Sequence, residues 1–85
     1  MPSSKNRKTL EDIFAIPVRA NIRWPDAETL LRAHGATITE GAGSRVRIDL
    51  NGVRAVFHRP HPRPETDKGA VVALRKFLEE AGITP

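Results

Sequence analysis

The stretch SRVRIDLNGVRAVFHR, residues 44–59, has the pattern of a β-hairpin. Asn51-Gly52 is a strong signal for a two-residue type I′ turn, because both residues tolerate the positive φ that the turn requires. With this turn as the loop, three cross-strand pairs are wholly apolar and share one face: Leu50–Val53, Ile48–Ala55 and Val46–Phe57. The other face carries Asp49–Arg54, Arg47–Val56 and Arg45–His58. A slip of one residue would mix the two sets, so the pattern predicts a single register.

The segments around the hairpin predict one more strand and three helices. Strands are expected over residues 36–40, 44–50 and 53–58. Helices are expected over residues 9–15, from Trp24-Pro25 to Gly35, and over about 68–81. We expect Thr9 and Asp67 to cap the first and last of these, and Gly35 and Gly82 to end the second and the last. Short connections favour an antiparallel sheet with its apolar face against the helices, which is an α+β two-layer sandwich of order α-α-β-β-β-α.

Length and composition predict one small domain. The chain has 85 residues, no cysteine and no apolar run approaching the ~20 residues that span a membrane. Residues 9–85 are expected to form the domain, and the polar, basic residues 1–8 are expected to be a flexible tail. The N-terminus lacks the apolar core of a signal peptide, which favours the cytoplasm.

The charge is concentrated where the hairpin lies. The net charge is +4, and residues 41–64 contain five arginines against the single acid Asp49. Arginine presents a planar fork that matches phosphate geometry, so a basic stripe on a sheet is typical of a polyanion binder. The alternative is a solvated strand face whose charges protect a sheet edge. Asp49 faces Arg54 in the predicted register and is expected to have a structural role.

A proline-rich arm follows the hairpin, with the sequence HRPHPRP at residues 58–64. Three prolines at alternate positions favour extended geometry, which would hold the arm's histidines and arginines in a defined relation. Lys68 lies in the first turn of the last helix, where a cation opposes the helix dipole unless an anion binds there. The residues predicted to contact RNA are Arg47, Arg59, His61, Arg63 and Lys68.

Several stretches together resemble the HicA toxins of bacterial toxin–antitoxin pairs. They are LLRAHGA at 30–36, Gly43-Ser44, the strand pair, HRPHP at 58–62 and KGAVVALRKFLEEAGI at 68–83. The resemblance covers roughly Trp24 to Ile83, and residues 9–23 are an addition to the shortest members. It implies a fold like that of double-stranded-RNA-binding domains and an mRNA interferase that blocks translation. It also implies a HicB antitoxin as partner, and it implies no cofactor.

The chain departs from the family's pattern at one position. The family usually has a histidine after Gly-Ser, held to be catalytic, whereas here Arg45 follows Ser44. The cross-strand neighbour of Arg45 is His58, and the Cβ atoms of such a pair lie about 4.5–5.5 Å apart. Histidine supplies a base near neutrality, and Arg45 a charge to stabilise the phosphorane. We therefore predict His58 and Arg45 as catalytic residues.

Two other functions remain open at this point. One is a non-catalytic RNA-binding or regulatory module that keeps the HicA fold and the HicB contact. The other is a small basic domain that only makes protein contacts. Three histidines without a neighbouring acid do not predict a metal site, so the predicted nuclease chemistry is metal-independent.

Overall fold

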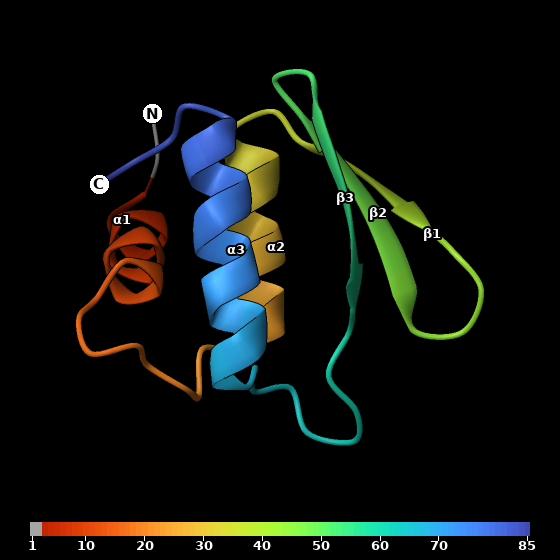
Figure 1. The fold of residues 1–85 in the computed structure, drawn as a ribbon, viewed down its shortest axis with the longest axis horizontal. Coiled ribbons are helices and arrows are strands. Elements are labelled where there is room, and N and C mark those ends of the chain that lie inside the picture. Colours follow the sequence, from red (N-terminus) through yellow and green to blue (C-terminus); the bar gives the residue numbers. More distant parts are fainter. Residues whose placement is uncertain (1–2) are drawn as a thin grey trace.

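The computed structural model describes residues 3–85 (Figure 1). The elements in chain order are α1 (Ser4–Ile13), α2 (Trp24–Ala33), β1 (Thr37–Glu40), β2 (Arg45–Leu50), β3 (Val53–His58) and α3 (Lys68–Glu80). This order confirms the predicted α+β class and the α-α-β-β-β-α sequence of elements. Within residues 3–85, no helix has the length and apolar character that crossing a membrane requires.

The hairpin has the predicted register. β2 and β3 are antiparallel, and Leu50 pairs with Val53, as Asn51 and Gly52 form the turn at φ values of 52° and 82°. β1 adds to the other side of β2, with Ile38 opposite Ile48, so the order in the sheet is β1-β2-β3. The strand β2 is therefore central, and β1 and β3 are the two edges.

The apolar face of the sheet packs against α2 and α3, and the core lies between these layers (Figure 1). The alternation along β2 buries Val46, Ile48 and Leu50, while the residues between them face outward. Phe57 of β3 lies between two aromatic rings, with centroids 5.8 Å from Trp24 and 5.8 Å from Phe77. The core also includes fully buried leucines and a valine of the helices: Leu30, Leu31, Val71, Leu74 and Leu78.

The ends of α2 and α3 follow the predicted signals. Asp67 caps α3, its carboxylate accepting a hydrogen bond from the Ala70 N–H at 2.7 Å. Gly35 and Gly82 follow the two helices with φ values of 93° and 80°, in the left-handed region that glycine adopts without strain. The Ile83 N–H then donates to the Leu78 carbonyl at 2.8 Å, which closes the last turn.

The tip of the hairpin is attached to the end of α3. The Asn51 side-chain amide donates to the Ala81 carbonyl at 2.9 Å, across 30 positions of sequence. This contact satisfies one of the carbonyl groups that a helix leaves without a partner at its C-terminus. Asn51 therefore forms the turn and also connects the sheet to a helix.

The prediction for the first helix is wrong in its bounds. α1 begins at Ser4, because Ser3 is the cap and accepts a hydrogen bond from the Asn6 N–H at 3.1 Å. Thr9 is no cap but lies in mid-helix, where its hydroxyl donates to the Lys5 carbonyl. Residues 4–8, expected to be part of a flexible tail, therefore form the first turns of α1. Residues 1 and 2 of that tail lie outside the described part of the chain.

α1 covers the side of α2 and α3 that faces away from the sheet (Figure 1). Leu10 and Ile13 are buried in this contact. Arg75 of α3 donates to the carbonyls of Ile13 and Ala15 at 3.0 and 2.8 Å, and so completes the C-terminal end of α1. α1 is therefore a third layer added to the two that were predicted.

We expect Phe57→Ala to reduce the free energy of unfolding by about 3–5 kcal/mol, the usual cost of deleting a buried aromatic ring. Phe57 is 7% exposed and contacts two other rings, so little of the cavity can be refilled. Urea denaturation followed by tryptophan fluorescence measures the loss. Val56→Ala is the matched control, because Val56 is 58% exposed and should change stability by less than about 0.5 kcal/mol. A loss below about 1 kcal/mol for Phe57→Ala would contradict a core role.

Candidate nucleic-acid interface

The open face of the sheet brings Arg45 and His58 together. They are cross-strand partners at the start of β2 and the end of β3, and both are exposed. The next pair along the ladder is hydrogen-bonded, as the Arg59 N–H donates to the Ser44 carbonyl at 2.8 Å. Bonded and non-bonded pairs alternate in an antiparallel ladder, so Arg45 and His58 form a non-bonded pair, in which side chains lie closest. The structure therefore places an imidazole and a guanidinium on neighbouring strands of the same face.

The rest of this open face is cationic with one apolar position. Arg47 lies between Thr39 of β1 and Val56 of β3, and both Arg47 and Val56 are exposed. Further toward the turn, Arg54 donates to the Asp49 carboxylate at 2.5 Å, and this contact raises the pKa of Arg54. Asp49 thus has the structural role expected of it, and Arg45 and Arg47 remain available on the face.

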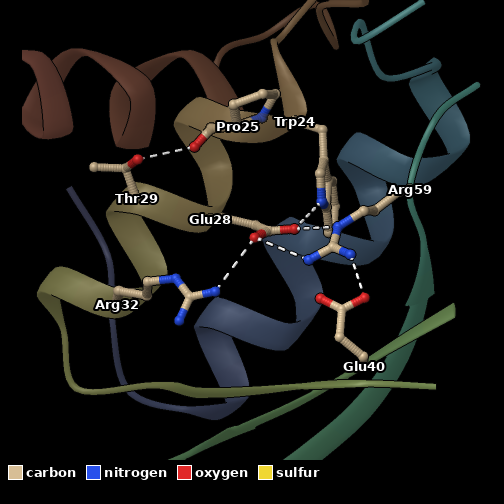
Figure 2. Close-up of polar contacts among 7 residues, drawn as sticks. All are labelled: Trp24, Pro25, Glu28, Thr29, Arg32, Glu40 and Arg59. Atoms are coloured by element: carbon tan, nitrogen blue, oxygen red, sulfur yellow. Dashed lines mark hydrogen bonds and ion pairs between the residues drawn. The ribbon is translucent and has the colours of Figure 1, made fainter. Parts of the chain in front are cut away.

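Arg59, predicted to bind RNA, instead contacts two carboxylates of this chain (Figure 2). Its guanidinium donates to Glu28 of α2 at 2.8 Å and to Glu40 at the end of β1 at 2.5 Å. Glu28 also accepts a hydrogen bond from the Trp24 indole N–H and lies 3.5 Å from Arg32. We call Trp24, Glu28, Glu40 and Arg59 the Arg59 clamp. It joins α2, β1 and the residue directly after His58.

The clamp is partly buried and electrostatically matched. Burial raises the pKa of Glu28, but hydrogen bonds from Arg59 and Trp24 and nearby positive charge outweigh it, so the pKa lies below its usual value. The hydrogen bond from Arg59 also lowers the pKa of Glu40, and Glu40 and Glu28 together raise the pKa of Arg59. Sequence analysis missed the clamp, because Arg59 lies 19 positions from Glu40 and 31 positions from Glu28, and no local pattern links them.

The proline-rich arm returns to the helical layer. The backbone N–H of Trp24 donates to the Pro64 carbonyl at 2.8 Å, and the backbone N–H of Thr66 donates to the Ile22 carbonyl at 2.8 Å. Between these two ties, Arg23 and Glu65 form an isolated β-bridge. The arm is thus attached at both ends, with the Arg59 clamp at its start and this bridge at its end. Sequence analysis expected an extended arm leading off the sheet, whereas residues 61–64 form successive bends and return the chain to the helices. The second attachment was missed.

The exposed side chains of the arm border a hollow of about 410 Å³. His58 and Arg59 lie at its upstream end, His61 and Arg63 on the arm itself, and Asp67 at its downstream end. His61 and Arg63 are therefore brought to the same hollow as His58 by the bends of the arm. The hollow adjoins the cationic face of the sheet, and His58 belongs to both surfaces.

The N-terminal end of α3 already has an anion. The Asp67 carboxylate occupies this position and accepts from the Ala70 N–H. Because this carboxylate balances the positive charge of a lysine in the first turn, the position of Lys68 does not require a bound anion. Lys68 is exposed and remains a candidate for phosphate contact from the side of the helix. Within residues 3–85, no three histidine, aspartate or glutamate side chains come together as metal ligands would.

The fold and the cationic face define a small α+β protein with the plan of double-stranded-RNA-binding domains. A family model described as the HicA toxin of bacterial toxin–antitoxin systems matches residues 24–83, which is more than half of the chain. The chain therefore belongs to the HicA toxin family. Comparisons with curated proteins and with solved structures gave no significant match. The matched range begins at α2, so α1 lies outside it.

We expect Glu28→Gln to lower the free energy of unfolding at neutral pH by about 1–2 kcal/mol, because charged hydrogen bonds contribute about that much when partly exposed. The folded chain holds the pKa of Glu28 below its unfolded value of about 4.3. This stabilisation is therefore complete above that pH and is lost as the pH falls through the lower, folded-state pKa.

Urea denaturation of both proteins from pH 7 to pH 3 checks this, and their difference should shrink toward the acid end. Asp49→Asn is the matched control, since the Arg54–Asp49 pair is exposed and screened by solvent and should contribute little to stability. A difference between Glu28→Gln and the parent that stays constant down to pH 3 would show that the clamp's charge does not stabilise the fold.

Proposed function

We propose that this HicA family toxin is an mRNA interferase, an RNA endonuclease that inhibits translation. The observation that carries the proposal is the Arg45–His58 pair on an open, cationic sheet face. The family's usual histidine position is occupied by Arg45, and the imidazole of His58 is its direct cross-strand neighbour on the same face. Membership of a toxin family supports the assignment, and so does the number of exposed arginines on the face.

The chemistry needs a base and a stabilising cation. His58 accepts the proton of a ribose 2′-hydroxyl, and the 2′-oxygen attacks the adjacent phosphorus. Arg45 stabilises the negative charge that develops on the phosphorane oxygens. The bond from phosphorus to the 5′-oxygen breaks, that oxygen takes a proton from solvent, and a 2′,3′-cyclic phosphate remains. Each role can be filled by a side chain, so the step as written requires no metal ion.

Other exposed cations would hold the RNA strand. Arg47 continues the face beyond Arg45, while His61 and Arg63 extend it along the arm, and Lys68 lies beyond them on α3. We assign Arg59 a different role from the one expected, because both carboxylates of its clamp would have to release it before a phosphate could bind. Arg59 is placed to fix the backbone next to His58.

A toxin of this family requires an antitoxin, and we propose a HicB-type protein as the partner. An acidic surface would be complementary to Arg45 and Arg47 and would cover His58. Its binding would stabilise the folded toxin by mass action and block access of RNA to the face. We place the pair in the cytoplasm, where mRNA is translated.

One observation favours a second function. Position 45 is occupied by arginine, whose guanidinium donates hydrogen bonds and does not serve as a general base, so the usual catalytic group of the family is missing. A non-catalytic RNA-binding or regulatory module would keep the cationic face and the partner contact without cleavage. The experiment below distinguishes the two.

We expect His58→Ala to lower RNA cleavage by about 10²–10⁴-fold, the usual contribution of a general base. Cleavage of a labelled RNA by purified toxin is measured in EDTA by gel, and growth arrest on induction is measured in cells. His61→Ala is the comparison variant: it removes an imidazole that holds RNA in this proposal but lies outside the Arg45 pair, so it should weaken RNA binding without removing the base. Arg45→His should raise cleavage by restoring the family's residue.

Two outcomes would contradict the proposal in different ways. If His58→Ala cleaves RNA and arrests growth like the parent, His58 is not the base. If the parent binds RNA but cleaves none, the non-catalytic module is the correct function. Circular dichroism of each variant shows whether the fold is intact.

A further inference from the structure

The outer edge of β3 is open. β3 is at one side of the sheet, and among the described residues no strand pairs with that side. It is six residues long, whereas β1 at the opposite edge has four. An edge strand of this length presents a row of backbone donors and acceptors that another chain can pair with.

The ladder identifies which backbone groups face outward. The hydrogen bond from Arg59 to Ser44 fixes the alternation, so Val53, Ala55 and Phe57 direct their backbone groups toward β2. Arg54, Val56 and His58 then direct theirs to the open edge. The side chains of these same three residues lie on the open face of the sheet, beside the backbone groups that are free to pair.

The side chains along this edge determine which kind of strand can pair with it. Val56 is 58% exposed and lies between Arg54 and His58 on the strand. On the other side of the edge, a groove separates β3 from α3, and its helical side is lined by Ala73, Lys76, Phe77 and Glu80. A strand laid along β3 would place every second side chain over the open face and the others over this groove. An apolar residue opposite Val56 would cover exposed apolar surface that now faces water.

Charge decides between the possible occupants. The open face of β2 and β3 carries three arginines against one aspartate, whereas the charges that line the groove, Lys76 and Glu80, offset each other. A second copy of β3 pairing antiparallel about Val56 would bring two arginine-rich faces together in one sheet, and charges of the same sign on neighbouring strands destabilise the pairing. A strand with acids at the positions opposite Arg54 and His58 has the charge complementary to the net positive charge of this face, to which Arg45 and Arg47 contribute.

We propose that the edge of β3 is a docking site for a strand of a partner protein that has an apolar centre and an acidic residue at each end. This strand joins the sheet as a fourth strand. This inference rests on the proposed function in one respect, because the strand would belong to the neutralising partner. A strand in this position lies directly beside His58, so it would block the Arg45–His58 pair by its backbone as well as by its charge. The pattern it needs is acid, apolar, apolar, apolar, acid.

The probe is a labelled peptide with Glu-Ile-Val-Ile-Glu at its centre, and the key variant of the full chain is Val56→Pro. Because the Val56 N–H faces outward, proline there removes a donor from the edge and leaves the β2–β3 ladder intact. We expect the peptide's Kd, measured by fluorescence anisotropy, to rise by at least about tenfold in this variant, as expected when a backbone hydrogen bond is lost and the ring obstructs pairing. Val56→Thr keeps the N–H and is the matched control.

Amide hydrogen exchange of the parent chain is the second measurement, and it tests the proposal even if Val56→Pro fails to fold. Bound peptide should slow exchange at Arg54, Val56 and His58. A peptide with lysine in place of glutamate should bind more weakly by at least about tenfold, since it repels the face.

Three results would overturn the proposal. The first is the absence of peptide binding, and the second is equal binding of the peptide to Val56→Pro and Val56→Thr. The third is exchange at the edge amides that slows with rising protein concentration when no peptide is present, because a second copy of the chain would then be the occupant. RNA cleavage by the parent is measured separately. Loss of cleavage with normal peptide binding refutes the nuclease function alone, and normal cleavage without peptide binding refutes the docking site alone.

Discussion

The two-residue turn at Asn51-Gly52 is the constraint on which the other features depend. It sets the register of β2 and β3, and the register assigns every side chain of both strands to one face. The same choice therefore creates the core and the cationic surface together. A shift of one residue would bury Arg47 and expose Ile48, which would remove the core contact with the helices and the Arg45–His58 pair at once.

The Arg59 clamp fixes the opposite end of the hairpin. Ion pairs near a surface usually contribute little, but Glu28 has a side chain that is 14% exposed and three donors that compensate its burial. The clamp holds the backbone one residue after His58 to α2 and β1. It also converts an arginine that sequence reasoning assigned to RNA into a structural residue. A guanidinium cannot serve two carboxylates and a phosphate with the same donors.

Sequence reasoning was most successful where the physical cause is local. The register of the hairpin, the caps of α3 and the glycine ends of α2 and α3 all follow from neighbouring residues, and each was predicted. The start of α1 was missed, because residues 4–8 are polar and basic and resemble a tail. Their helix is held by Ser3 and by burial against α2, and the second of these cannot be seen in a short window of sequence. The clamp and the return of the arm to Ile22 were missed for the same reason, because their partners are far apart in the chain. The Arg45–His58 juxtaposition was predicted, since it follows from the turn alone, whereas its catalytic role stays a prediction.

Asn51 has a consequence for the chemical lifetime of the protein. Aspartate suits a type I′ turn about as well as asparagine, but only the amide can donate to the Ala81 carbonyl. Asn-Gly is also the dipeptide most prone to deamidation, since glycine leaves the asparagine side chain open to attack by the following backbone nitrogen. Ageing at this position would replace a donor by a carboxylate facing the negative end of α3. The residue that fixes the register is therefore also the position at which the folded chain is expected to deamidate first.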